Sequence, residues 1–395
     1  MTLTIQYEAR CLDFPQELSD HVFEILRNDS SSLKHCSLVC RAWLHATRSH
    51  LFRQVILTPN NIVPFTFLII DSRSTVHSHV RKLELRRINY SAGLLANFTS
   101  TLTHLHLRDM SFNTVIDILD IICSLPYLQS VALDELTVET GFENLLAHIQ
   151  KKILPPTVNS VRCRGGSCVR TFLLWLLHHN SIPKLSGLDV GPIKEESTFE
   201  IGKYIASAGP AVKHLSLSFD FGHNTHTCAL EDYGKQMLSI TEHTKANVFS
   251  IAERYKALFG LDVCPNLGSL TGLQSLRLDN FIHFEDRIKS TALVWAPRII
   301  ASGRANELRE VVLGITLQKA SQLDAFNIHW EFFDEAFATM VGPYANLVSL
   351  TFVVAGQVNV DGIASLIRSR LPGCEKRGLL QFCREGLLRR RQRTC

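Results

Sequence analysis

Near the beginning of the chain, apolar residues recur at intervals of three and four between residues 12 and 53. The first stripe opens at Pro15, and three serines at 30–32 interrupt it. Its apolar members are Leu18, Val22, Ile25 and Leu26, and the second stripe contains Leu33, Cys36, Val39, Cys40 and Trp43. This spacing predicts two or three short helices. About forty residues cannot close a large core alone, so these side chains need a partner surface, either in the rest of the chain or in another protein.

Beyond residue 75, one phrase recurs: an apolar residue, two variable residues, and then an apolar-x-apolar pair. The copies occupy 80–88, 102–110, 128–136, 158–166, 185–193, 212–220, 273–281, 308–316 and 347–355. The first six begin 22, 26, 30, 27 and 27 residues apart, and a gap of 61 follows. Such a period is typical of a solenoid of strand-plus-helix units. The apolar pair of each strand is expected to face inward, because strand side chains alternate between faces.

The segments between the copies have helical patterns, and many end just before Pro or Gly, which stop helices. Helices are expected at 114–124, 140–151, 169–180, 199–208, 287–295, 322–341 and 360–370. The main interruption, residues 231–259, has loose helical periodicity. It is either a helical excursion or a further repeat whose strand is not visible. Residues 371–382 are expected to form a final strand cap.

The opening segment resembles a known family. It contains Phe-Pro-x-Glu-Leu at 14–18, a Ser-rich break, Cys-Ser-Leu-Val-Cys-Arg-x-Trp at 36–43, and Leu-Phe-Arg at 51–53. Together these are similar to an F-box, the three-helix module that docks a substrate receptor onto the Skp adaptor of a cullin–RING ubiquitin ligase. Phe14 departs from the Leu that the family usually has there. The resemblance covers about a tenth of the chain and implies a set of adaptor-binding or module-packing residues: Phe14, Pro15, Leu18, Val22, Leu26, Leu33, Cys36, Val39, Cys40 and Trp43. The alternative is an ordinary helical cap that packs on the following domain.

The later copies resemble leucine-rich repeats of the kind found behind F-boxes, especially in fungal F-box proteins with divergent repeats. The usual Asn after the strand is replaced by Ile88, Met110 and Leu136, so an irregular solenoid without an Asn ladder is expected. The predicted fold class is therefore α/β, with a three-helix F-box followed by an irregular solenoid of alternating strands and helices. The expected ranges are F-box 1–57, linker 58–75, repeat domain 76–384 and basic tail 385–395. An unrelated α/β domain with accidental repeat phrases is the alternative.

Composition narrows the function classes. The chain has 395 residues, 46% of them hydrophobic and 20% charged, as in ordinary globular proteins. A net charge of +4 is too small over this length to imply nucleic acid. No signal peptide or membrane span is visible, and eleven cysteines, an odd number, argue against a complete disulfide framework. We therefore expect a cytoplasmic or nuclear protein with no membrane or nucleic-acid partner.

Enzyme signatures are missing from the sequence. It has no phosphate-binding Gly loop, no dinucleotide fingerprint, no nucleophile elbow and no HExxH helix. Cys163 and Cys168, and His223, His226 and Cys228, have loose ligand-like spacing but no evident fourth ligand. The prediction is a non-catalytic protein without a metal or another cofactor.

A surface is the better functional candidate. In each strand, the residues between and beside the inward pair are expected on the opposite, open face. In the first four copies these include five Lys or Arg, two His and two acids. Such a stripe could bind an acidic or phosphorylated target through charge-assisted hydrogen bonds; the alternative is a solvated face. The candidate target-binding residues are Lys82, Arg86, His104, His106, Arg108, Arg162 and Arg164.

These observations favour a substrate receptor of a cullin–RING ligase of the SCF type, in which the F-box binds the Skp adaptor and the repeat domain binds a target. The second hypothesis is a scaffold that binds the adaptor without promoting ubiquitin transfer. The third is an enzyme with a hidden active site, which would require a convergent polar pocket with strongly shifted pKa values.

Overall fold

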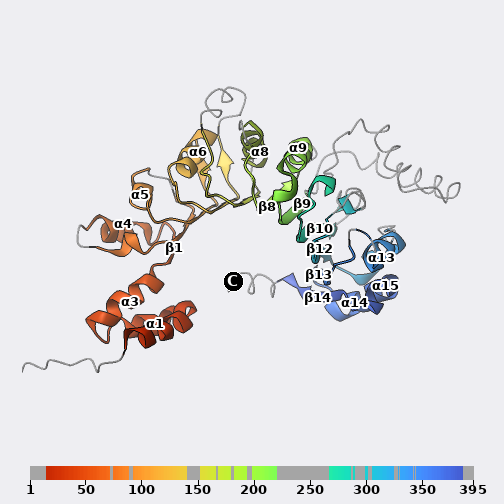
Figure 1. The fold of residues 1–395 in the computed structure, drawn as a ribbon, viewed down its shortest axis with the longest axis horizontal. Coiled ribbons are helices and arrows are strands. Elements are labelled where there is room, and N and C mark those ends of the chain that lie inside the picture. The colour runs from red at the N-terminus through yellow and green to blue at the C-terminus, as the bar shows by residue number, and fades with distance from the viewer. Residues whose placement is uncertain are drawn as a thin grey trace, which may run out of the picture. The chain divides into compact units, whose positions relative to one another are not determined.

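The computed structural model has an α/β fold whose strands pair almost entirely in parallel (Figure 1). It describes residues 15–71, 74–88, 92–139, 152–165, 168–178, 182–193, 198–219, 267–285, 288–289, 299–300, 305–323, 328, 330–340, 342 and 344–385. The chain forms two compact units: unit 1 comprises 1–148 and 152–158, and unit 2 comprises 149–151 and 159–393. Unit 1 thus contains the range expected as an F-box, the expected linker and the first strand copies.

Unit 1 begins with three α-helices: α1 (Gln16–Ile25), α2 (Ser30–Cys36) and α3 (Arg41–Leu51). The serines that separate the two apolar stripes form the first turn of α2. The break falls at Asp29, whose carboxylate accepts hydrogen bonds from the Ser31 and Ser32 amides at 3.1 Å and so caps the helix. Phe23 is fully buried and meets Trp43 edge to face, with ring centroids 5.3 Å apart. This pair and Leu33 form the small apolar interior of the three-helix segment.

The sheet of unit 1 has the parallel order β1-β2-β3-β5. Its strands are β1 (Gln54–Leu57), β2 (Lys82–Arg86), β3 (His104–Arg108) and β5 (Ser130–Asp134). The helices α4 (Ile62–Ile70), α5 (Ala92–Ala96) and α6 (Val115–Cys123) connect them, and β4 (Ser111–Phe112) pairs with β6 (Thr137–Val138). Leu83 and Leu85 are buried, whereas the residues beside them are half-exposed. The alternation expected from the repeated phrase is therefore present.

The expected linker range, 58–75, contains α4. This nine-residue helix carries no charged side chain, and the ring of Phe65 stacks on that of Phe98 at 6.3 Å. The Gly- and Ser-rich composition of a flexible linker is lacking here, so the apolar run folds and packs instead.

In the described residues directly after β2 and β3, the backbone itself closes the turn. Arg87 and Asp109 have left-handed φ angles of 53° and 51°. Their backbone N–H groups donate to Arg108 O at 3.2 Å and Asp134 O at 3.0 Å, which continues the sheet hydrogen bonds past each strand. Because the backbone closes the turn, the next position can be apolar. Three residues in this position, Ile88, Met110 and Leu136, are 7%, 2% and 0% exposed.

Unit 2 has seven parallel strands in the order β7-β8-β9-β10-β12-β13-β14, and β11 pairs antiparallel to β10. They are β7 (Ser160–Arg164), β8 (Gly187–Ile193), β9 (His214–Phe219), β10 (Ser275–Glu285), β11 (Ile288–Lys289), β12 (Glu310–Leu317), β13 (Ser349–Gly356) and β14 (Leu380–Arg384). Its helices include α8 (Cys168–His178), α9 (Thr198–Ala208), α13 (Trp330–Ala338), α14 (Val360–Arg370) and α15 (Pro372–Lys376).

All nine copies of the repeated phrase form strands, and most of the expected helices are present. Two expectations were wrong in detail. A strand, β11, begins where the helix 287–295 was expected, and the helix expected at 322–341 shortens to α13, preceded by a 3-10 turn at Ala320–Leu323. The expected helix at 140–151, the interruption at 231–259 and residues 386–395 of the tail lie outside the described residues.

Candidate functional site

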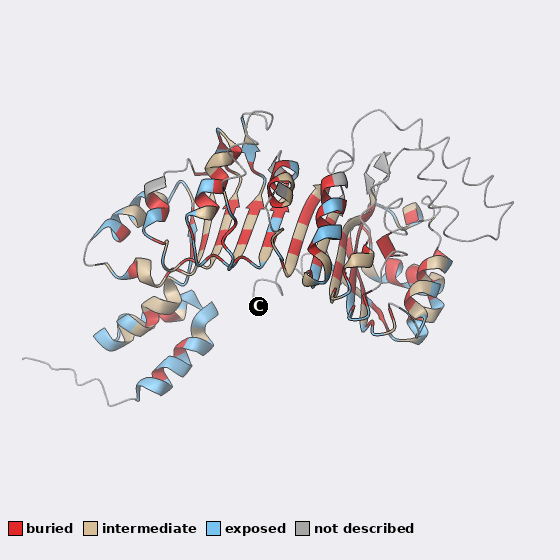
Figure 2. Ribbon diagram, turned by 45° about the horizontal axis from the view of Figure 1, so that its top comes forward, coloured by how far each residue is buried: buried red, intermediate tan, exposed pale blue. Residues whose placement is uncertain are grey.

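Helix α1 carries apolar residues on two faces. One face holds Phe23, which is buried, and the half-buried Leu26 follows directly after the helix. The other face holds an outer stripe at intervals of three and four residues, which places its members on one side of the helix. The outer stripe consists of Pro15, Leu18, Val22 and Ile25. Leu18, Val22 and Ile25 are 51%, 39% and 70% exposed, and Figure 2 shows how much of the three-helix segment is exposed. The structure thus leaves this stripe uncovered.

The turn between α2 and α3 adds two further exposed apolar side chains, Leu38 at 83% and Val39 at 61%. Contiguous exposed apolar surface on a protein often marks an interaction site. The remaining residues predicted to bind the adaptor divide as follows: Cys36, Cys40 and Trp43 are half-buried, Leu33 is 1% exposed and belongs to the interior, and Phe14 lies outside the described residues.

Sequence reasoning missed Phe23, the centre of the interior, and did not include Ile25 or Leu38 among the binding residues. Helical spacing did contain a signal for Ile25, which falls one turn after Val22. It gave no comparable signal for Leu38, which lies in a turn rather than in a helix.

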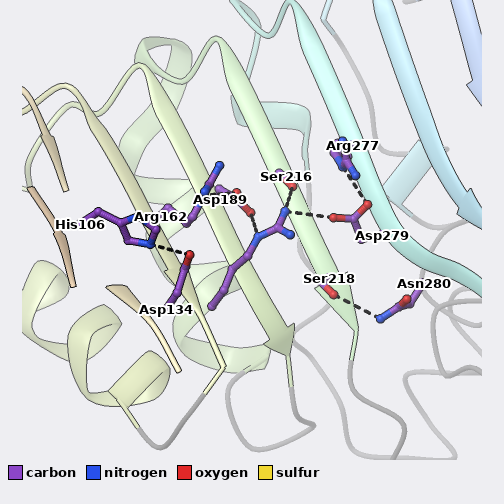
Figure 3. Close-up of polar contacts among 10 residues, drawn as sticks. His106, Asp134, Arg162, Asp189, Ser216, Ser218, Arg277, Asp279 and Asn280 are labelled. Carbon is purple, nitrogen blue, oxygen red and sulfur yellow. Dashed lines mark hydrogen bonds and ion pairs between the residues drawn. The ribbon is translucent and has the colours of Figure 1, made fainter. Parts of the chain in front are cut away.

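On the open face of unit 1, His106 lies between two carboxylates from the neighbouring strands. Its Nε2 is 2.8 Å from Asp134 Oδ2 (Figure 3), and its Nδ1 is 3.3 Å from Glu84 Oε1. Glu84 also accepts a hydrogen bond from Arg86 Nε at 2.5 Å. Burial alone would lower the pKa of His106, but its hydrogen bonds to Asp134 and Glu84 outweigh burial and raise it. Burial opposes ionisation of Glu84, but His106 and Arg86 lower its pKa to about 2.

These pKa shifts predict a pH-dependent contribution to the stability of unit 1. Because the pKa of His106 is raised on folding, its contribution is complete below the unfolded value of about 6.5 and is lost as pH rises through the folded pKa. The loss in unfolding free energy caused by His106→Gln should therefore be larger at about pH 5.5 than at about pH 8.5. Urea unfolding of both proteins at the two pH values measures this difference. An equal loss at both would show that the imidazolium does not stabilise the fold.

On the open face of unit 2, Arg164 extends across three other strands. Its Nε donates to Asp189 Oδ1 on β8 at 2.8 Å, and its Nη2 donates to Asp279 Oδ2 on β10 at 3.0 Å and to Ser216 Oγ on β9 at 3.3 Å. Arg162 and Arg277 complete the network through the other oxygens of the two aspartates (Figure 3).

The predicted target-binding residues therefore do lie on the open faces, but most of them have partners within the chain. Arg86 and His106 are paired with Glu84 and Asp134, and Arg162 and Arg164 are paired with Asp189 and Asp279. Among the described residues, the ion-pair contact of Arg108 is a long one, 3.7 Å to the neighbouring Asp109, and its side chain is 43% exposed. Lys82 and His104 lie at the amino-terminal ends of their strands. The stripe is thus much less positive than its Lys and Arg residues alone suggest.

The described ranges contain no group of three or more His, Cys, Asp or Glu side chains that could hold a metal ion. Cys163 is buried in β7, and His223, His226 and Cys228 lie outside those ranges. Within the same ranges, no helix is both long and apolar enough to cross a membrane. No protein-family model matches this chain, and no curated protein matches its sequence.

Proposed function

We propose that this chain is the substrate-recognition subunit of a cullin–RING ubiquitin ligase of the SCF type. Residues 1–57 act as an F-box that binds the Skp adaptor, and the strand-and-helix region acts as an irregular, leucine-rich-repeat-like solenoid that binds a target protein. The single observation that carries the proposal is the outer stripe of α1, whose large apolar side chains stay exposed although the inner face of the helix is packed.

The arrangement of α1 fits a docking module better than a helical cap. A cap that packs on the following domain would cover its apolar stripe, yet Leu18 and Ile25 are 51% and 70% exposed. A second polypeptide that covers the outer stripe would gain roughly 25 cal/mol for each Å² of apolar surface removed from water. The turn at Leu38 and Val39 presents a further exposed apolar pair in the same three-helix segment.

In this role the chain performs no chemistry. It holds a target near the ubiquitin-transfer machinery, and the rate gain comes from proximity and orientation. The adaptor-binding scaffold of the second hypothesis would make the same first contact but would recruit no cullin.

Co-purification tests the proposal. The tagged full-length chain is combined with a purified Skp-type adaptor and then with a cullin–RING pair. A stable complex with the adaptor, followed by recruitment of the cullin, is the expected result. Binding of the adaptor without the cullin would favour the scaffold, and no binding of the adaptor would refute both.

A further inference from the structure

Positive side chains gather at the amino-terminal edge of the sheet of unit 1. Arg53 O accepts hydrogen bonds from the amides of Arg81 at 3.0 Å and Lys82 at 2.8 Å, which places the start of β2 beside the end of the α3 segment. Arg81 O in turn accepts from the amide of His104 at 2.9 Å, and Lys82 and His104 are register partners. Adjacent strands lie about 4.8 Å apart, so Lys82 and His104 are immediate neighbours across the sheet.

Two more basic groups lie close to this row. Arg48 is in the last turn of α3, and His79 lies three residues before the start of β2. Burial and the positive charges of Arg81, Arg48, His45 and His77 lower the pKa of His79. Burial, Lys82 and Arg53 likewise lower the pKa of His104. We call this set the basic edge, and it consists of Arg48, Arg53, His79, Arg81, Lys82 and His104.

The basic edge differs from the open face in how close its counter-charges lie: Arg53 helps to lower the pKa of Glu24, but Glu24 makes its ion pairs with Arg27 and His50. Within the part of the chain that the structure describes, no ion pair joins a carboxylate to any residue of the basic edge. Arg81 donates instead to the backbone carbonyls of Ser78 and Val80. At the opposite ends of the same strands, Arg86 pairs with Glu84, and Arg87 and Arg108 lie 3.6 and 3.7 Å from Asp109.

Like charges on neighbouring strands destabilise a sheet, and a surface of one sign attracts ligands of the opposite sign. We propose that the basic edge binds a carboxylate-rich segment of a protein partner. The role of the basic edge as a target-binding surface depends on the receptor function proposed above. Its affinity for carboxylates does not involve the adaptor.

The composition of the basic edge favours a protein segment over nucleic acid. Affinity for nucleic acid depends on many Lys and Arg side chains that neutralise successive phosphates. The basic edge has four such residues, and its other two members are imidazoles, which ordinarily carry little charge at neutral pH.

The test uses the full-length chain and a fluorescein-labelled octaglutamate peptide, with binding followed by fluorescence anisotropy at low salt. Arg53→Gln together with Lys82→Gln should weaken binding about tenfold, because each exposed charge contributes up to about a fivefold change. Neither side chain makes a hydrogen bond or ion pair within the described ranges, so the fold should persist, as a thermal melt would check.

The matched control is Arg27→Gln together with Arg87→Gln, which removes the same charge from two other places in unit 1. Because Glu24 lies beside Arg27 and Asp109 lies beside Arg87, this variant should bind octaglutamate within about twofold of the unmodified chain. Three outcomes would overturn the proposal: no binding by the unmodified chain, equal losses in the two variants, or tighter binding of a DNA oligonucleotide of the same charge than of octaglutamate. None of them bears on docking of the adaptor.

Discussion

Replacing Leu18 and Val22 together by Asp is expected to weaken binding of the Skp-type adaptor at least about 100-fold. Each substitution removes an apolar side chain worth roughly 1.5 kcal/mol when buried and brings a carboxylate into the same interface. The sum is about 3–5 kcal/mol, and every 1.4 kcal/mol corresponds to a factor of ten. Titration of the adaptor onto immobilised full-length chain measures the change.

The fold of this double variant should be preserved, since both side chains are already exposed at 51% and 39%. Surface substitutions usually change stability by no more than about 0.5 kcal/mol each. The control is Ile153→Asp, which alters an apolar side chain that is 72% exposed elsewhere in unit 1. If the double variant bound the adaptor as tightly as the Ile153→Asp control does, the outer stripe would not be the adaptor-binding surface.

Phe23→Ala is expected to unfold the three-helix segment. Phe23 is fully buried and packs edge to face on Trp43. Loss of a buried Phe costs about 3–5 kcal/mol of unfolding free energy. This is a large part of the stability that a segment of three short helices can supply. Hydrogen exchange should then speed up throughout α1, α2 and α3 and remain unchanged in the strands of unit 2.

Ile25→Ala is the matched control for Phe23→Ala, because it shortens a side chain of the same helix that is 70% exposed. Its exchange rates should stay close to those of the unmodified chain. If Phe23→Ala left the exchange of α3 unchanged, the two helices would not share an interior.

The strands could be predicted from the sequence because their signal is local. An apolar-x-apolar pair at a regular period requires a strand with one buried face, and all nine copies form one. The details depend on other contacts. Within the expected linker range, 58–75, the sequence gives no sign that Phe65 of α4 stacks on Phe98. The left-handed turns at Arg87 and Asp109 had no Gly or Asn to mark them.

The charged faces were predictable only in part. Strand alternation correctly places Arg162 and Arg164 on the open side, away from the buried Val161 and Cys163. It does not reveal that Arg164 pairs with Asp189, 25 residues away, and with Asp279, 115 residues away. A count of charges strand by strand therefore overestimates the positive potential of the face.

The apolar stripes of the first helices show a similar limit. Leu18 and Leu33 both belong to the apolar stripes with helical spacing, so the pattern alone does not separate the interior from the exposed surface. Burial separates them, because Leu33 is 1% exposed and Leu18 is 51% exposed. The proposed receptor function depends on the claim that a Skp-type adaptor covers this exposed surface.

Hydroxyl-radical footprinting tests that claim most directly. Oxidation of Leu18, Val22 and Ile25 is measured in the full-length chain alone and with a saturating amount of purified Skp-type adaptor; Ile153 and Met340, which are 72% and 74% exposed, serve as internal references. We expect the three residues of α1 to be oxidised in the free chain and protected in the complex, whereas the oxidation of the two reference residues should not change. Protection already in the free chain, or no protection by the adaptor, would contradict it.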